Sequence, residues 1–232
     1  MKRTPSRELL DDDAGTPAEV AGSLADLRLI NHYLGGASTT RRIIERVARE
    51  RGTSSFSMLE VAAGSGELPE FIRSELHSKG IRLQLTLLDR RPSHLGRGEN
   101  RVAGDALALP FPNSSFDLVS CCLFVHHLSP PEVNAFVKEA LRCSRVAVLI
   151  NDLVRHPVHL AAACAGRLIY RSRITRNDAP ASVRQAYTTS EMRGMLEQSG
   201  ASRMEIVRRY FYRMGAILWK DPAMNGRIHP DI

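Results

Sequence analysis

Aromatic residues are scarce in this chain, and long apolar runs are missing. Aromatic side chains make up 6% of the 232 residues, which leaves few surfaces on which the bases of a single-stranded RNA could stack. No run approaches the roughly 18 apolar residues of a membrane span, and the first residues contain no apolar signal region. We therefore expect a cytoplasmic protein without an integral membrane segment and without a nucleic-acid partner.

Cysteines are also few, and their spacing is uninformative. They form no CxxC pair, and no histidine accompanies them at metal-ligand spacing. A disulfide framework or a structural zinc site would need such spacing. We expect no metal and four reduced, mostly buried thiols: Cys121, Cys122, Cys143 and Cys164.

Lysine is the third scarcity, because most of the basic side chains are arginine. Lysine and arginine number 32 against 25 acidic residues, which gives a net charge of +7, and 43% of the chain is hydrophobic. This composition suits one α/β domain with a normal core. Residues 1–17 are polar and contain two prolines, so we expect a flexible N-terminal arm followed by a single domain over 18–232.

Helical spacing of apolar residues predicts two helices after the arm, over residues 18–34 and 39–50. We interpret them as an N-terminal helical cap. The cap either covers one edge of a sheet or also contacts a ligand through Asn31, His32 or Tyr33.

A glycine turn follows an apolar run and leads into a helix. Leu59 and Val61 are typical of a buried strand, and Gly64 and Gly66 allow a ligand to approach the backbone closely. A helix is predicted over residues 70–79, with Pro69 in its first turn. A strand, a turn and a helix in this order are typical of nucleotide-like ligand sites.

Two aspartates follow the next apolar segments. Asp89 ends a strand predicted over residues 83–88, where a carboxylate can accept hydrogen bonds from both hydroxyls of a ribose. The alternative is a turn residue before Arg90-Arg91-Pro92. Asp105 comes after a second short apolar segment and could accept a hydrogen bond from an exocyclic amine.

Strands and helices continue to alternate to the end of the chain. Strands are predicted over residues 115–122 and 145–150, and helices over 132–141 and 191–198. Two late strands, 204–211 and 214–220, are close enough in sequence to form a hairpin. The alternation indicates an α/β sheet with helices on both faces.

Four motifs in order resemble those of class I S-adenosylmethionine-dependent methyltransferases: Glu60-x-Ala-x-Gly64-x-Gly66, Asp89, Gly104-Asp105-Ala106 and residues 116–128. The chain is most similar to the small-molecule branch that includes ubiquinone and menaquinone biosynthesis enzymes. The resemblance covers roughly residues 55–152 motif by motif. It implies a Rossmann-like, seven-stranded, mostly parallel sheet of order 3-2-1-4-5-7-6, with an antiparallel seventh strand, and S-adenosylmethionine as cofactor.

The resemblance also implies which residues bind the cofactor. The glycine turn and Glu60 would hold the methionine part, Asp89 the ribose, and Asp105 with Ala106 the adenine. Ala62 departs from the family, which has a glycine there. Its methyl group either weakens cofactor binding or is tolerated at negative φ, and we expect the departure to be tolerable because Gly64 and Gly66 remain. The full expected set is Glu60, Ala62, Ala63, Gly64, Ser65, Gly66, Asp89, Arg90, Asp105, Ala106, Cys121 and Cys122.

Methyl transfer from a sulfonium is an in-line displacement in which positioning dominates. A phenolic acceptor would be helped by a base near neutrality, and His127 or His126 follows the fourth strand on the ligand side. The alternative for either histidine is packing or hydrogen bonding within its loop. Asp152, Arg155 and His156 follow the fifth strand; Asp152 either acts on the acceptor or caps a helix.

Residues 153–187 separate the fifth strand from the next helix by an unusually long segment. We interpret this segment as a substrate lid, with an apolar helix over residues 159–170. It contains six arginines against one aspartate. The basic charge indicates a pocket for an acidic or lipid-like acceptor, an RNA-facing patch, or arginine stems that cover a solvated helix.

The leading hypothesis is a methyltransferase that transfers a methyl group to oxygen or carbon of a small-molecule acceptor. A phenolic, quinone-like or polyketide-type acceptor, typical of secondary metabolism, is expected. The alternatives are an RNA or protein methyltransferase, a dinucleotide-binding oxidoreductase, and a binding protein that keeps only the fold.

Overall fold

The computed structural model describes residues 1–12, 14–96 and 98–220, so the end of the expected domain, residues 221–232, lies outside the described residues. Seven strands form one sheet in the order β3-β2-β1-β4-β5-β7-β6. This confirms the predicted order, and β7 is antiparallel to β5 as expected. The strands are β1 (Ser55–Val61), β2 (Arg82–Asp89), β3 (Arg101–Ala103), β4 (Phe116–Cys122), β5 (Ser144–Leu153), β6 (Arg203–Arg209) and β7 (Arg213–Trp219).

The central strands are apolar along their whole length because both faces of the sheet are covered. Met58, Leu59 and Val61 of β1 are all completely buried although they point to alternate faces. β1 pairs in parallel with β2 and β4, and β4 pairs in parallel with β5. Parallel pairing brings the carboxyl ends of four strands to one edge of the sheet, where open α/β sheets bind ligands.

Helices cover the sheet on both faces. On one face, α2 and α3 pack on Met58, Leu118 and Leu149, and on the other α4 and α7 pack on Leu59, Val119 and Val148. The helices are α1 (Pro17–Tyr33), α2 (Gly36–Arg51), α3 (Glu67–His77), the short 3-10 helix η1 (Val125–His127), α4 (Pro130–Cys143), α5 (Pro157–Gly166), α6 (Arg173–Gln185) and α7 (Thr189–Leu196).

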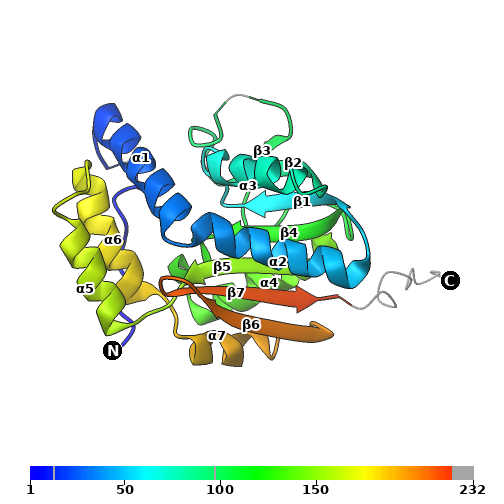
Figure 1. Cartoon of the computed structure of the whole chain (residues 1–232). Coiled ribbons are helices and arrows are strands. Elements are labelled where there is room, and N and C mark those ends of the chain that lie inside the picture. The colour runs from blue at the N-terminus through cyan, green and yellow to red at the C-terminus, as the bar shows by residue number, and fades with distance from the viewer. Residues whose placement is uncertain (13, 97, 221–232) are drawn as a thin grey trace.

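The N-terminal helices differ from the edge cap that the sequence suggested. α2 lies across the face of the sheet over β5 and β7, two interior strands, and therefore covers a face rather than an edge. The apolar stripe of α2, with Ile43, Ile44 and Val47, is completely buried there. α1 instead stands beside α6 (Figure 1), at the end of the sheet toward which β1 points.

The lid segment, residues 153–187, forms two helices rather than one. α5 and α6 pack against each other, with Ala163 and Val183 in one apolar cluster that also contains Leu153 at the end of β5. Their axes stand at the same end of the sheet as α1 (Figure 1). The predicted apolar helix begins at Pro157 and ends at Gly166, so it is shorter than expected. None of the described helices is long and apolar enough to cross a membrane.

Residues 1–12 run between the lid segment and η1. The Arg3 guanidinium donates to the carbonyl oxygens of Gln185 at 2.6 Å and His126 at 2.9 Å. Glu8 is 8% exposed, and its Oε1 accepts hydrogen bonds from Ser182 and Gln185. The arm is docked in this structure, and its expected flexibility stays a prediction.

The late hairpin forms where the sequence predicted it, with a connection shifted by a few residues. β6 ends at Arg209, and Phe211 and Tyr212 take positive φ angles of 50° and 55° in the turn. The predicted strands left Arg213 in the connection between them. In the structure it is the first residue of β7. The shift brings the Arg213 side chain into the protein interior, where it is 1% exposed.

Candidate active site

A large cleft of about 2420 Å³ lies at the carboxyl edge of the sheet. The ends of β1, β2 and β4 form its floor, and α1, α5, α6 and the N-terminal arm form its walls. The cleft therefore joins the glycine turn and the lid segment in one space. Asn31, His32 and Tyr33 line it too, so the N-terminal helices reach the ligand side as well as covering the sheet.

The glycine turn contains three residues in the left-handed region. Their φ angles are 55° at Ala62, 52° at Gly64 and 78° at Gly66. Of the two alternatives for Ala62, tolerance at a negative φ is wrong, because the turn bends sharply directly after β1. An alanine in this region is strained by about 1–2 kcal/mol relative to glycine.

The two glycines of this turn serve different purposes. A Cβ at Gly64 would meet no heavy atom within 4 Å, so this position is open to the cleft. A Cβ at Gly66 would overlap the Leu87 side chain and lie 3.2 Å from Arg101. Gly64 thus leaves room for a ligand, whereas Gly66 allows the start of α3 to pack on β2.

Asp89 is held rigidly at the end of β2. Its Oδ2 accepts from the Gly64 backbone N–H at 2.8 Å, and its Oδ1 accepts from the Arg91 N–H at 3.0 Å. A carboxylate has about four acceptor positions, so two remain for a ligand. Asp89 lines the cleft and also fixes the turn that carries Gly64.

Two buried, oppositely charged side chains reach the cleft with unpaired atoms. Burial raises the pKa of Glu60 to about 7, and its Oε2 has no hydrogen-bond partner. Arg213 donates from Nη2 to Asn31 at 2.9 Å, while its buried Nη1 has no partner. Burial also lowers the pKa of Arg213. Buried polar groups of this kind cost free energy unless a ligand pairs with them.

Most of the expected cofactor residues do line the cleft. Asp105 is at its exposed rim, where Oδ1 accepts from the Leu107 N–H at 2.9 Å. Gly66 and Cys121 do not line it, since Gly66 packs on β2 and Cys121 lies in the core. The expected residues that do are Glu60, Ala62, Ala63, Gly64, Ser65, Asp89, Arg90, Asp105, Ala106 and Cys122.

The His126 side chain is buried, and it lines the cleft. Its Nδ1 lies 2.7 Å from Asp152 Oδ1, and its backbone N–H donates to Asp152 Oδ2 at 2.9 Å. Burial alone would lower the pKa of His126, but the charges of Asp152 and Glu8 outweigh it and raise it to about 10. Asp152 is 1% exposed and reaches the cleft only through His126, and its pKa is lowered because the charge of His126 outweighs burial.

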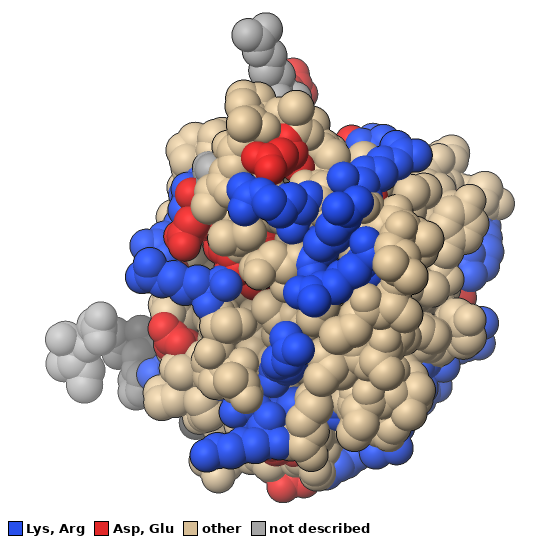
Figure 2. All heavy atoms as spheres, turned by 90° about the vertical axis from the view of Figure 1, so that its left-hand side faces the viewer, with Lys and Arg blue, Asp and Glu red and all other residues tan. Residues whose placement is uncertain are grey.

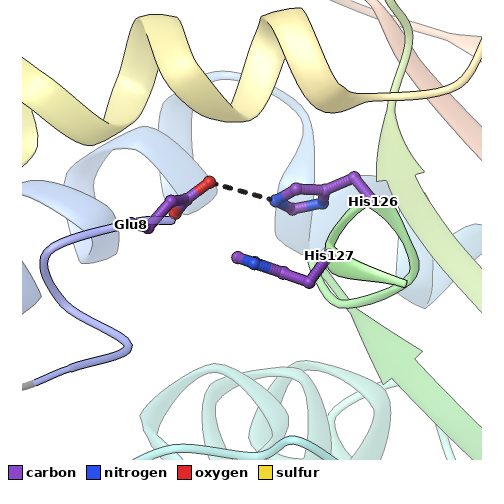
Figure 3. Close-up of side chains that lie close together, drawn as sticks. All are labelled: Glu8, His126 and His127. Atoms are coloured by element: carbon purple, nitrogen blue, oxygen red, sulfur yellow. Dashed lines mark ion pairs between the residues drawn. The ribbon is translucent and has the colours of Figure 1, made fainter. Parts of the chain in front are cut away.

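His127 lies beside His126 and pairs with a second residue of the arm. The two imidazole rings are 4.1 Å apart between centroids, and His127 Nδ1 lies 3.0 Å from Asp11 Oδ2. Figure 3 shows both histidines projecting from η1 toward Glu8, beneath a helix of the lid. The Nε2 of His126 is 3.7 Å from Glu8 Oε1.

Three cleft residues were missed by the sequence reasoning: Glu8, Asp11 and Arg213. Glu8 and Asp11 belong to the arm, in which no chemistry was recognised, and Arg213 was assigned to a turn. The only available signal was the presence of acidic residues at positions 8 and 11. That signal is weak, because solvated acidic residues are common in polar arms.

None of the six described arginines of the lid segment lines the cleft, and four of them have partners within the protein. Arg155 donates to the Ala186 carbonyl and to Glu191, and Arg173 pairs with Glu19. Arg167 and Arg176 donate to backbone carbonyl oxygens. Figure 2 shows basic side chains spread over this side of the molecule with acidic ones nearby. These contacts favour the interpretation that arginine stems cover the lid.

The other polar residues near the lid also have structural partners. The Tyr187 hydroxyl donates to the Leu128 carbonyl at 2.7 Å, and His156 is the N-cap of α5, accepting from the Val158 N–H at 3.2 Å. Neither His156 nor Arg155 lines the cleft. Of Asp152, Arg155 and His156, only Asp152 therefore keeps a link to the cleft, through its contact with His126.

Comparisons with known proteins agree with this geometry. Residues 59–147 match the family model of a methyltransferase domain. The chain is 26% identical over 203 residues to a ubiquinone/menaquinone biosynthesis C-methyltransferase of Methylococcus capsulatus, covering 77% of each chain. It is 27% identical over 228 residues to its counterpart of Methylobacterium nodulans, covering 84% of this chain and 86% of that one.

A solved structure shows the same fold at lower identity. The plantazolicin methyltransferase BamL, in complex with a triazolic desmethylPZN analog and S-adenosylhomocysteine, superposes with a TM-score of 0.66 at 14% identity. The match covers 88% of this chain and 91% of that chain.

The sheet order, the glycine turn and these matches define a class I S-adenosylmethionine-dependent methyltransferase. The chain is an enzyme of this class, and its cofactor is S-adenosylmethionine.

Proposed function

We propose that this enzyme methylates an apolar, phenolic, quinone-like or polyketide-type small molecule at oxygen or carbon. The observation that carries the proposal is the composition of the cleft wall opposite the glycine turn. Apolar side chains of α1, the lid segment and the turn between β6 and β7 dominate this wall: Val20, Leu24, Leu27, Ile30, Leu153, Ala163, Val183 and Phe211. A wall of this kind suits an apolar acceptor oriented by a few polar groups.

The unpaired atoms of the cleft fit the amino-acid end of the cofactor. Glu60 presents a carboxylate oxygen and Arg213 a guanidinium nitrogen, each buried and without a partner. An α-ammonium group would pair with the first and an α-carboxylate with the second. We assign Glu60 and Arg213 to these two groups, an assignment that the sequence motif supports for Glu60 only.

The remaining cofactor contacts follow the expected pattern. Gly64 leaves space for the ligand, Asp89 has two free acceptor positions for ribose hydroxyls, and Asp105 with Ala106 stands at the rim for the adenine. The cofactor supplies an electrophilic methyl group on a sulfonium. The task left to this chain is to hold the acceptor in line with it and to keep water out.

We assign the reacting end of the acceptor to the part of the cleft beside His126 and His127. Because the pKa of His126 is raised to about 10, its imidazole is already protonated near neutral pH and cannot accept another proton. His126 therefore serves as a hydrogen-bond donor held by Asp152, and the base that a phenol would need falls to His127 or to solvent. His127 is the better placed of the two predicted bases, because its side chain keeps 22% of its surface exposed.

Turnover with a panel of acceptors tests the proposal. The purified enzyme is incubated with S-adenosylmethionine and with phenols, hydroxyquinones, aromatic polyketides, a short RNA and a basic peptide. Mass spectrometry should find a methyl adduct on an apolar hydroxylated or quinone-like compound, with no product in the Asp89→Ala control. Methylation confined to the RNA or the peptide would overturn the proposed acceptor class while leaving the enzyme class intact.

A further inference from the structure

The geometry points to a divalent metal site formed by Glu8, His126 and His127 at the wall of the cleft. One ligand atom from each residue can be chosen so that all three lie within 4.8 Å of one another. All three residues line the cleft, so the site would be open to the acceptor on one side. The sequence predicted no metal, because Glu8 lies 118 residues before His126 and no motif spacing connects them.

The separation of the ligand atoms suits a shared cation. Glu8 Oε1 and His126 Nε2 face each other at 3.7 Å, which is longer than a good hydrogen bond. Two ligands on one tetrahedral zinc ion, at bond lengths of about 2.0–2.1 Å, lie about 3.3 Å apart. A small inward movement of Glu8 would therefore place both atoms at bonding distance from one ion.

Each histidine is oriented through its other ring nitrogen, as metal ligands usually are. Asp152 lies 2.7 Å from Nδ1 of His126, and Asp11 lies 3.0 Å from Nδ1 of His127. A carboxylate on Nδ1 leaves Nε2 as the metal-binding atom and makes it more basic. The two rings are 4.1 Å apart between centroids and tilted by 35°, and one ligand atom of each lies within 4.8 Å of the other.

The third ligand is held by two donors of the lid segment. Ser182 Oγ and Gln185 Nε2 donate to Glu8 Oε1 at 2.5 and 2.6 Å, and both donors lie on α6. The cluster therefore joins the arm and η1, and the lid segment orients its carboxylate. A single exposed acidic cluster would have no such set of orienting partners.

The ligand types select the metal. Two imidazoles and one carboxylate are the ligand set of many catalytic zinc sites and of non-haem iron sites, and both keep open positions for a substrate. Magnesium and calcium prefer oxygen ligands only. The charge also fits, because the carboxylates of Glu8, Asp11 and Asp152 surround the two histidines. A cation would take the place that the Nε2 proton of His126 otherwise fills.

A metal here would define the acceptor more narrowly, an inference that rests on the proposed function. An oxygen of the acceptor would bind the open coordination position, and a hydroxyl bound there loses its proton to solvent more easily because the cation stabilises the oxyanion. Acceptors with a phenolic or enolic oxygen, in particular those with a second oxygen beside it, would be preferred over simple hydrocarbons.

The test is metal titration of the full chain after removal of metals with a chelator. Zn²⁺ binding is measured by calorimetry, and Co²⁺ binding by the visible absorption of a tetrahedral or five-coordinate site. We expect one equivalent bound by the wild type, and at least a hundredfold weaker binding by His127→Ala and by Glu8→Gln. His77→Ala, which removes an exposed histidine at the end of α3, is the matched control and should bind like the wild type.

S-adenosylhomocysteine binding is measured on the same samples and separates the two proposals. Retained affinity shows that each variant is folded and that the cofactor pocket is intact. Failure of the wild type to bind one equivalent of either metal, or equal binding by both cluster variants, would overturn the metal site and leave the methyltransferase assignment untouched. An equal loss in His77→Ala would also overturn it, because binding would then be an unspecific histidine effect.

Discussion

Glu60 offers a direct link between a buried charge and cofactor binding, which the substitution Glu60→Gln tests. The side chain is 3% exposed, and burial raises its pKa from 4.5 to about 7. Glutamine keeps the size of the side chain and removes the charge. The variant should therefore relieve the cost of a buried carboxylate in the ligand-free protein and weaken the binding of a cofactor that carries an ammonium group.

The magnitude follows from the pKa shift. A rise from 4.5 to about 7 corresponds to about 3 kcal/mol of folding free energy. Because the folded protein holds the proton more tightly than the unfolded chain, this contribution is fully present below pH 4.5 and is lost as the pH rises through about 7. Between about pH 5 and about pH 8.5 the wild type should lose about 2–3 kcal/mol through this group.

The assay is urea denaturation of wild type and Glu60→Gln at both pH values. The free energy of unfolding of the variant, measured relative to that of the wild type, should be larger by about 2–3 kcal/mol at the higher pH than at the lower pH. Other titrating groups cancel in this difference. Glu67→Gln is the matched control, because Glu67 is exposed and paired with Arg28 on the surface; its difference from the wild type should not follow this pH dependence.

Cofactor affinity provides the second half of the test. Loss of a charge-assisted hydrogen bond of about 1.5–3 kcal/mol should weaken binding of S-adenosylhomocysteine by about 10- to 100-fold in Glu60→Gln. In the wild type, affinity should fall as the pH is lowered through about 7, and in the variant it should not. Parallel pH dependence of stability in the two proteins, together with unchanged affinity, would refute the reasoning.

Three further predictions concern the glycine turn and Asp89. Ala62→Gly should raise the free energy of unfolding by about 0.5–1 kcal/mol, because it relieves the left-handed strain. Ala63→Gly, at a position without positive φ, should lower the free energy of unfolding by a similar amount. Thermal denaturation of the two variants and the wild type measures both changes. Gly64→Ala should keep most of the stability and lose S-adenosylhomocysteine affinity in calorimetry. Gly66→Ala should lose more stability, because its Cβ would overlap Leu87. A larger loss of stability in Gly64→Ala than in Gly66→Ala would contradict the roles given to the two glycines. Asp89→Asn should weaken cofactor binding by at least tenfold, since one oxygen that accepts from backbone or ribose becomes a donor; wild-type affinity in calorimetry would exclude its ribose role.

The sheet could be predicted from the sequence because its information is local. Apolar runs such as residues 83–88 end at chemically distinctive residues such as Asp89, and the motif order supplied the topology through the resemblance. α6 could not be predicted in the same way. Its 13 residues include three arginines, one asparagine, one aspartate and Pro180. It forms because Ser172 caps it and Ile174 and Val183 are buried against its neighbours.

The candidate site divides along the same line. Glu60, Gly64 and Asp89, which line the cleft, could be selected from the sequence because they lie at or just after strand ends at motif spacing. Glu8 and Arg213 were missed, because their surroundings arise from residues more than 100 positions away in the chain. The protonated state of His126 was missed for a similar reason, since its partner Asp152 lies on β5, 26 residues further along the chain.

The central claim is that the cleft binds the cofactor through the glycine turn, Asp89 and the Glu60–Arg213 pair. The most direct measurement is a crystal structure of the enzyme with S-adenosylhomocysteine. We expect the ribose hydroxyls on Asp89, the thioether chain over Gly64, the ammonium on Glu60 and the carboxylate on Arg213. A ligand bound outside this cleft, or one whose amino-acid end points away from both Glu60 and Arg213, would contradict it.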